Sequence, residues 1–153
     1  MKPLQKGDLA PEFEALDQEG NLVRLTDCLA KGPVVLLFYP RAMTKGCTAE
    51  ACHFRDLGTE LGEFGALRLG ISTDSIDRQK TFSAKHDLDF PLLSDPDRAI
   101  ADAFGVKRPG PLFNRRVTFV IGTDRVVIET IASETNMNAH GDGAIAALRS
   151  PRS

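Results

Sequence analysis

Two cysteines, Cys47 and Cys52, are the residues of this chain whose type and spacing most clearly suggest chemistry. An apolar run from Val34 to Tyr39 ends at Pro40 and is followed, after a short polar loop, by Cys47 at the expected start of a helix. The unpaired backbone N–H groups of a helix N-terminus carry roughly half a positive charge, which favours a thiolate over a thiol. A thiolate with a second cysteine nearby on the same helix indicates redox catalysis.

The spacing between the two cysteines also makes a mechanical prediction. Five residues of α-helix turn by about 140° and rise about 7.5 Å, so the two Cα atoms lie roughly 9 Å apart. A disulfide requires Cα atoms within about 7 Å of one another. An intact helix therefore keeps Cys47 and Cys52 apart, and a disulfide between them requires the first turns to unwind.

The elements that position these cysteines follow from periodicity and turn signals. The sequence predicts an N-terminal β-hairpin with its turn at 18–21, and strands at 34–39, 67–71, 117–121 and 126–131. It predicts helices at 44–64, with Thr44 as N-cap, and at 75–86, 97–104 and 139–148. This order indicates an α/β protein. Open α/β sheets hold their ligands at the carboxyl ends of strands, where the helix of Cys47 begins.

Length and charge narrow the class of protein. A chain of 153 residues is long enough for one substantial core, so residues 1–153 are predicted to form a single domain. The net charge of −2, with no basic run longer than Arg115-Arg116, argues against nucleic-acid binding. No apolar stretch approaches the roughly 20 residues of a membrane span, and the start of the chain lacks the apolar region of a secretory signal. We therefore expect a cytoplasmic protein, in which a disulfide is transient and catalytic.

The residues around Cys47 resemble the peroxiredoxin family, in particular its bacterioferritin-comigratory branch. The motif is P-x-x-x-T-x-x-C, formed by Pro40, Thr44 and Cys47, and it continues as T-x-E-A-C-x-F-R-D from 48 to 56. The similarity extends from residue 7 to about residue 148 and includes Arg116 at the start of a late strand. It implies a thioredoxin-like fold with an N-terminal β-hairpin extension.

The resemblance also implies a function, a thiol-dependent peroxidase that reduces hydrogen peroxide and organic hydroperoxides. Cys47 is then the peroxidatic cysteine, whose thiolate attacks the peroxide and becomes a sulfenic acid. Thr44 and Arg116 orient the peroxide and stabilise the developing charge, and Pro40 shields the thiolate from water.

Two further assignments depend on position. Strand alternation places Arg115 and Arg116 on opposite faces, and the register of the following strand selects Arg116 as the inward one. Glu50 is either a favourable acid in the first turn of the helix or, as the resemblance implies, a residue that shapes the hydrogen bonding of the site.

The other cysteines leave alternatives open. Cys52 is either the resolving cysteine that captures the sulfenic acid or a core cysteine packed under the helix. Cys28 matches no motif of the family and is interpreted as incidental. The resemblance implies that thioredoxin or a similar dithiol reduces the disulfide.

Two other functions are compatible with a pair of cysteines on one helix. A dithiol–disulfide oxidoreductase usually has a Cys-x-x-Cys motif, and a non-enzymatic redox sensor or chaperone could use the unwinding helix as a signal. The spacings of His and Cys match no zinc site and no phosphate-binding loop occurs, so we expect no cofactor. We expect a monomer, with a homodimer as the alternative. Lys45 and Ala42-Met43 differ from the usual family pattern and leave the preferred peroxide open.

Overall fold

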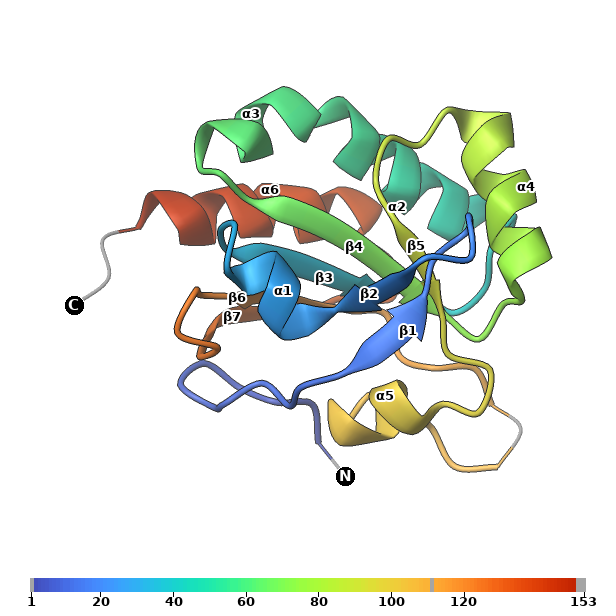
Figure 1. Ribbon diagram of the computed structural model, residues 1–153, viewed down its shortest axis with the longest axis horizontal. Helices are drawn as coiled ribbons and strands as arrows, with labels where there is room; N and C mark the ends of the chain where they lie inside the picture. Colours follow the sequence, from blue (N-terminus) through green and yellow to red (C-terminus); the bar gives the residue numbers. More distant parts are fainter. Residues whose placement is uncertain (1, 111, 151–153) are drawn as a thin grey trace.

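The structure of the protein, a computed structural model, describes residues 2–110 and 112–150. The elements in chain order are β1 (Glu14–Leu16), β2 (Leu22–Arg24), α1 (Leu25–Leu29), β3 (Val34–Phe38), α2 (Lys45–Asp56), α3 (Gly58–Glu63), β4 (Leu67–Ser72), α4 (Ile76–His86), β5 (Leu92–Ser94), α5 (Ala99–Ala103), β6 (Val117–Ile121), β7 (Val127–Ala132) and α6 (Met137–Arg149). Among the described residues, seven strands form one mixed sheet in the order β2-β1-β5-β4-β3-β6-β7 (Figure 1).

Helices cover both faces of this sheet (Figure 1). Side chains of α2, α3, α4 and α6 form the core on one face, and those of α1 and α5 form the core on the other. Strand β3 is buried on both faces: Val35 and Leu37 join the first core, whereas Leu36 and Phe38 join the second. A strand buried on both faces reads as a continuous apolar run, which is why the sequence predicts it directly.

The register of the sheet brings two distant segments to one edge. β3 pairs in parallel with β4 and antiparallel with β6, and Phe38 at the end of β3 lies opposite Val117 at the start of β6. Arg116 therefore precedes β6 at the level where the chain leaves β3 for α2. This edge holds both Arg116 and the loop that leads to Cys47.

The long helix predicted at 44–64 is two helices, α2 and α3, separated at Leu57. Leu57 has φ −88° and ψ 6°, outside the helical region, and Gly58 follows it. The guanidinium of Arg68 on β4 donates a hydrogen bond of 3.0 Å to the carbonyl of Phe54 in the last turn of α2. A tertiary partner thus satisfies a terminal carbonyl, which local periodicity cannot reveal.

Other elements differ more modestly from the sequence prediction. The hairpin is confirmed as β1 and β2, but α1 and β5 were not anticipated. The helix predicted at 97–104 shortens to α5, because the carboxylate of Asp95 accepts hydrogen bonds from the backbone of Ile100 and Ala101 and sets a later start. Within residues 2–110 and 112–150, no helix has the length and apolarity needed to cross a bilayer.

The loop between β3 and α2 is anchored by two residues that follow β4. Asp74 accepts a 2.7 Å hydrogen bond from the amide of Ala42, and Arg78 donates a 3.0 Å bond to the carbonyl of Ala42. Arg78 and Asp74 also form an ion pair at 2.8 Å. The next residue, Met43, has φ 65°, a conformation that costs a non-glycine residue of order 1 kcal/mol or more. The anchor at Ala42 holds this strained loop in place.

A glycine between α1 and β3 provides a test of the packing at the opposite end of β3. A Cβ added at Gly32 would lie 2.1 Å from the backbone oxygen of Gly65, whereas one added at exposed Gly62 in α3 meets nothing within 4 Å. We expect Gly32→Ala to lower the free energy of unfolding by about 1–3 kcal/mol, because backbone must move. Gly62→Ala, the matched control, should raise it by about 0.5–1 kcal/mol through helix propensity. Urea unfolding measures both, and equal effects would contradict the close approach.

Candidate active site

Cys47 lies in the first turn of α2 and is 1% exposed. The helix begins at Lys45, after the N-cap residue Thr44, whose carbonyl accepts a 2.9 Å hydrogen bond from the amide of Thr48. The first residues of α2, Lys45-Gly46-Cys47-Thr48, contain no acid, so no carboxylate within the first turn offsets the positive end of the helix dipole. The sulfur is thus held where negative charge is favoured.

Arg116 is the positive side chain in contact with this sulfur. Its Nη1 donates to Cys47 Sγ at 3.3 Å and to Glu50 Oε1 at 2.9 Å, and the side chain is only 8% exposed. Burial opposes the charge of the guanidinium, but the two acidic partners raise the pKa of Arg116 above its ordinary value. Arg115 is exposed. The two arginines therefore differ as strand alternation requires, and only Arg116 reaches the sulfur.

Glu50 is a buried member of the site and does not lie in the first turn of the helix. Its side chain is fully buried, and burial raises the pKa of Glu50 to about 7 against the opposing effect of Arg116. Its Oε1 accepts from Arg116, whereas Oε2 has no hydrogen-bond partner among the described residues. The interpretation of Glu50 as a first-turn acid is therefore wrong, because α2 begins at Lys45 and places Glu50 in its second turn.

A second layer of polar side chains, which sequence reasoning missed, lies behind Glu50. His140 on α6 is buried, with Nδ1 3.5 Å from Glu50 Oε2 and 2.8 Å from the hydroxyl of Thr118. Its Nε2 lies 2.8 Å from the carbonyl of Ser133. Outside this layer, the carboxylate of Glu134 accepts a 3.0 Å hydrogen bond from the backbone amide of Arg116. Nothing local to α6 in the sequence indicates that its histidine faces α2.

The side chain of Thr44 does not make the helix-capping hydrogen bond that the sequence predicts. It occupies the N-cap position, but its hydroxyl donates to the carbonyl of Arg41 at 2.8 Å instead of accepting from a helix amide. Because its proton is committed, the exposed oxygen has only acceptor capacity left for a ligand. Pro40 is partly buried and begins the same loop.

The two other cysteines lie in different surroundings. Cys52 is half-buried on α2, in the same continuous helix as Cys47, and the three cysteines of the described chain are free thiols. Cys28 lies on the other face of the sheet, and burial raises the pKa of its thiol. Cys28 therefore has neither the location nor the electrostatic environment of Cys47.

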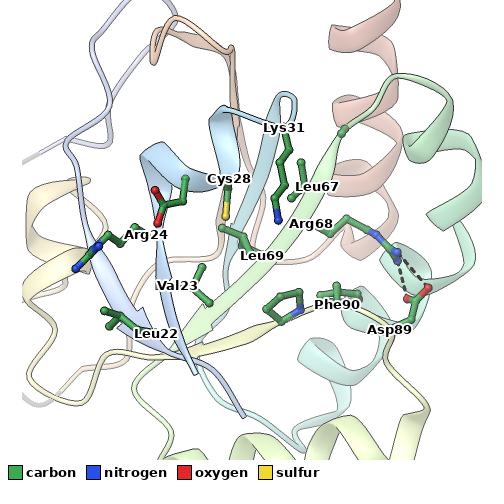
Figure 2. Close-up of a pocket in the computed structure, with 13 residues that line it drawn as sticks. Leu22, Val23, Arg24, Cys28, Lys31, Leu67, Arg68, Leu69, Asp89 and Phe90 are labelled. Atoms are coloured by element: carbon green, nitrogen blue, oxygen red, sulfur yellow. Dashed lines mark hydrogen bonds and ion pairs between the residues drawn. The ribbon is translucent and has the colours of Figure 1, made fainter. Parts of the chain in front are cut away.

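A cavity of about 510 Å³ lies away from Cys47. It is lined by side chains of the α1 face, among them Val23, Leu67 and Leu69, and Figure 2 shows the side chains of Cys28 and Lys31 pointing into it. Neither Cys47 nor any residue that contacts its sulfur lines this cavity, although Phe90, one of the lining residues, also packs into the core that contains Cys47. The redox chemistry is thus separate from this hollow, because Cys47 packs in the core on the opposite face.

Metal-ligand residue types do not converge in the described ranges. No group of three or more His, Cys, Asp or Glu side chains there is placed to hold a metal ion. The acidic and imidazole groups near Cys47 are instead engaged with Arg116, Thr118 and the backbone.

Known proteins resemble this chain along almost its whole length. The sequence matches the AhpC/TSA family over residues 6–130. A putative peroxiredoxin of Mycobacterium tuberculosis is 52% identical over 153 residues, covering 98% of this chain and 99% of the relative. The crystal structure of the peroxidoxin BcpB of the same species superposes with a TM-score of 0.94 at 50% identity, covering 98% of this chain and 99% of that one. A bacterioferritin comigratory protein of Xanthomonas campestris superposes with a TM-score of 0.83 at 31% identity, covering 90% of each chain.

These similarities confirm the thioredoxin-like fold of the peroxiredoxin type and the family expected from the motif around Cys47. The chain belongs to the AhpC/TSA family and, within it, to the bacterioferritin-comigratory branch of the peroxiredoxins, which are thiol-dependent peroxidases.

Proposed function

We propose that Cys47 is the peroxidatic cysteine of this thiol-dependent peroxidase. The observation that supports it is the 3.3 Å contact between Arg116 Nη1 and Cys47 Sγ in the first turn of a helix. The thiolate attacks the terminal oxygen of a hydroperoxide, so an S–O bond forms while the O–O bond breaks. Cys47 becomes a sulfenic acid, and the departing oxyanion takes up a proton to leave as water or an alcohol.

Thr44 and Arg116 have complementary roles in this proposal. The oxygen of Thr44 accepts the O–H of the peroxide, because its own proton is donated to the carbonyl of Arg41. Arg116 and the backbone N–H of Cys47 stabilise the negative charge that moves from sulfur to the departing oxygen. Pro40, which has no N–H, keeps a competing donor away from the sulfur.

Cys52 is the proposed resolving cysteine. It attacks the sulfenic acid, forming an intramolecular disulfide and releasing water. Cys47 is buried and Cys52 half-buried on one continuous helix, so the first turns of α2 must unwind before the sulfurs meet. A dithiol, thioredoxin or a similar protein, then reduces the disulfide. Because both cysteines belong to one chain, a monomer can complete the cycle.

The surroundings of the loop support organic hydroperoxides as substrates beside hydrogen peroxide. Phe113 and Leu112 are exposed large apolar side chains, and the guanidinium carbon of Arg41 lies 5.9 Å from the ring centroid of Phe113. Arg41 is also the residue whose carbonyl binds Thr44. An exposed aromatic ring therefore packs on the side chain of the residue whose backbone carbonyl holds Thr44. The X. campestris relative has been studied for alkyl peroxide reduction.

Replacing the proposed nucleophile tests the function itself. Cys47→Ser should reduce peroxide consumption to the uncatalysed rate, because a hydroxyl without an activating base is a far weaker nucleophile. Cys28→Ser, the matched control on the other face of the sheet, should keep its activity. Peroxide consumption with thioredoxin as reductant measures both. Turnover in Cys47→Ser, or its loss in well-folded Cys28→Ser, would move the nucleophile elsewhere.

Replacing Arg116 tests whether its positive charge makes Cys47 reactive. Arg116→Ala should slow the peroxide step by about tenfold, equivalent to about 1.4 kcal/mol, because the positive side chain in contact with the sulfur is lost. Arg115→Ala, at an exposed neighbour, should leave the rate unchanged. Stopped-flow oxidation by hydrogen peroxide at pH 7 measures both variants. Equal losses in the two variants would show that general surface charge, not the contact with the sulfur, is responsible.

Cys52→Ser separates a resolving cysteine from a packed one. The first oxidation of Cys47 should persist, thioredoxin-supported turnover should fail, and excess peroxide should convert the trapped sulfenic acid to the sulfinic form. Single-turnover kinetics and mass spectrometry follow these steps. Full turnover in a well-folded variant would instead indicate a one-cysteine peroxidase.

A further inference from the structure

One nitrogen of Arg116 has two acceptors. Its Nη1 lies 3.3 Å from Cys47 Sγ and 2.9 Å from Glu50 Oε1. A negative charge on Glu50 therefore competes with a negative charge on Cys47 for the same donor. With a single proton between them, the pair exists either as thiolate with carboxylic acid or as thiol with carboxylate, and only the first form can attack a peroxide.

The imidazole of His140 faces Oε2, the second carboxylate oxygen of Glu50. The Ser133 carbonyl can only accept, so His140 Nε2 carries the hydrogen in their 2.8 Å contact. Nδ1 of the neutral ring is then an acceptor, with the Thr118 hydroxyl at 2.8 Å and Glu50 Oε2 at 3.5 Å. Oε2 is buried and finds no other partner among the described residues. A carboxylic acid proton on Oε2 would have an acceptor in the imidazole.

The charges around the pair favour a neutral ring. Burial lowers the pKa of His140, helped by the nearby positive charge of Arg116, although the Ser133 carbonyl and Glu134 act in the opposite direction. Burial raises the pKa of Glu50 to about 7, and Glu134 contributes in the same direction. The ring of His53 on α2 lies 2.9 Å from the carboxylate of Asp142 on α6, nearer the solvent.

We propose that His140 is a positioning residue for the peroxide step: its Nδ1 accepts the proton held by Glu50 Oε2, which keeps Glu50 neutral and leaves the charge of Arg116 to the Cys47 thiolate. The Thr118 hydroxyl and Glu50 share the lone pair of Nδ1. No net proton is gained or lost by the pair, since the proton resides on the carboxyl instead of the sulfur. This inference rests on the proposed role of Cys47.

The same placement sets a direction with pH. As the pH rises through about 7, Glu50 loses its proton, and its carboxylate then competes with the Cys47 thiolate for the positive charge of Arg116. The peroxide rate per thiolate should then fall. Glu50→Gln, whose amide cannot ionise, should lack this inflection in the pH profile of the rate.

Two substitutions at His140 separate its two nitrogens. In His140→Gln the amide reaches toward the Nε2 position and leaves no acceptor at the Nδ1 position, whereas His140→Asn places an amide near Nδ1. We expect His140→Gln to lower the thiolate fraction at pH 7 and slow the peroxide step by about tenfold, equivalent to about 1.4 kcal/mol. His140→Asn should recover most of this loss. Equal losses in two folded variants, or better recovery by Gln, would overturn the proposal.

An NMR titration of protein that keeps His140 tests the proposal even if the His140 variants do not fold. In protein labelled with ¹³C at glutamate carboxyl carbons, the signal absent in Glu50→Gln should titrate near pH 7. In Cys47→Ser its midpoint should move to lower pH, because coupling is reciprocal and the competing thiolate is gone. ¹⁵N shifts should show neutral His140 protonated on Nε2.

An unchanged Glu50 midpoint in Cys47→Ser, a midpoint near the ordinary value of glutamate, or a protonated Nδ1 at pH 7 would overturn the proposal. These outcomes are distinguishable from failure of the proposed function. If Cys47 were not the nucleophile, peroxide consumption would survive in Cys47→Ser whatever the carboxyl titration showed.

Discussion

The charge of Arg116 is buried beside the sulfur of Cys47, and much of the surrounding structure makes that burial tolerable. A buried cation without partners is strongly unfavourable, so acidic neighbours are needed here, although the buried Nε of Arg116 has no hydrogen-bond partner among the described residues. Cys47 and Glu50 provide two acceptors to one nitrogen, and Glu134 fixes the backbone of Arg116 from outside. The reactive sulfur is therefore also a structural partner of the arginine.

The sheet and one helix pair determine where these partners meet. Because Phe38 on β3 pairs with Val117 on β6, Arg116 reaches the edge of the sheet at which α2 begins. Helix α6 packs closely on α2: a Cβ added at Gly141 would lie 2.8 Å from a ring carbon of His53. This close approach of α6 places the adjacent His140 against Glu50. The electrostatics at Cys47 therefore depend on contacts between segments about seventy residues or more apart in sequence.

That separation explains what the sequence could and could not predict. The apolar run from Val34 and the cysteine after the loop are local patterns, and they predicted β3 and the start of α2 correctly. The hydrogen bond to the last turn of α2 comes from Arg68, and the loop anchor at Ala42 comes from Asp74, so neither contact has a local signal. Three-residue strands such as β5 form because neighbouring strands pair with them, which propensity alone does not reveal.

The first turn of α2 combines two requirements that oppose each other. It must hold the thiolate against Arg116, yet it must unwind if Cys52 is to reach Cys47. The Thr44 hydroxyl donates to Arg41, so the helix start lacks a stabilising side-chain cap worth about 1 kcal/mol. In the proposed cycle, oxidation converts the thiolate to a neutral sulfenic acid. The attraction to Arg116 that fixed the first turn then weakens at the step after which unwinding is needed, so the chemistry itself releases the helix for resolution.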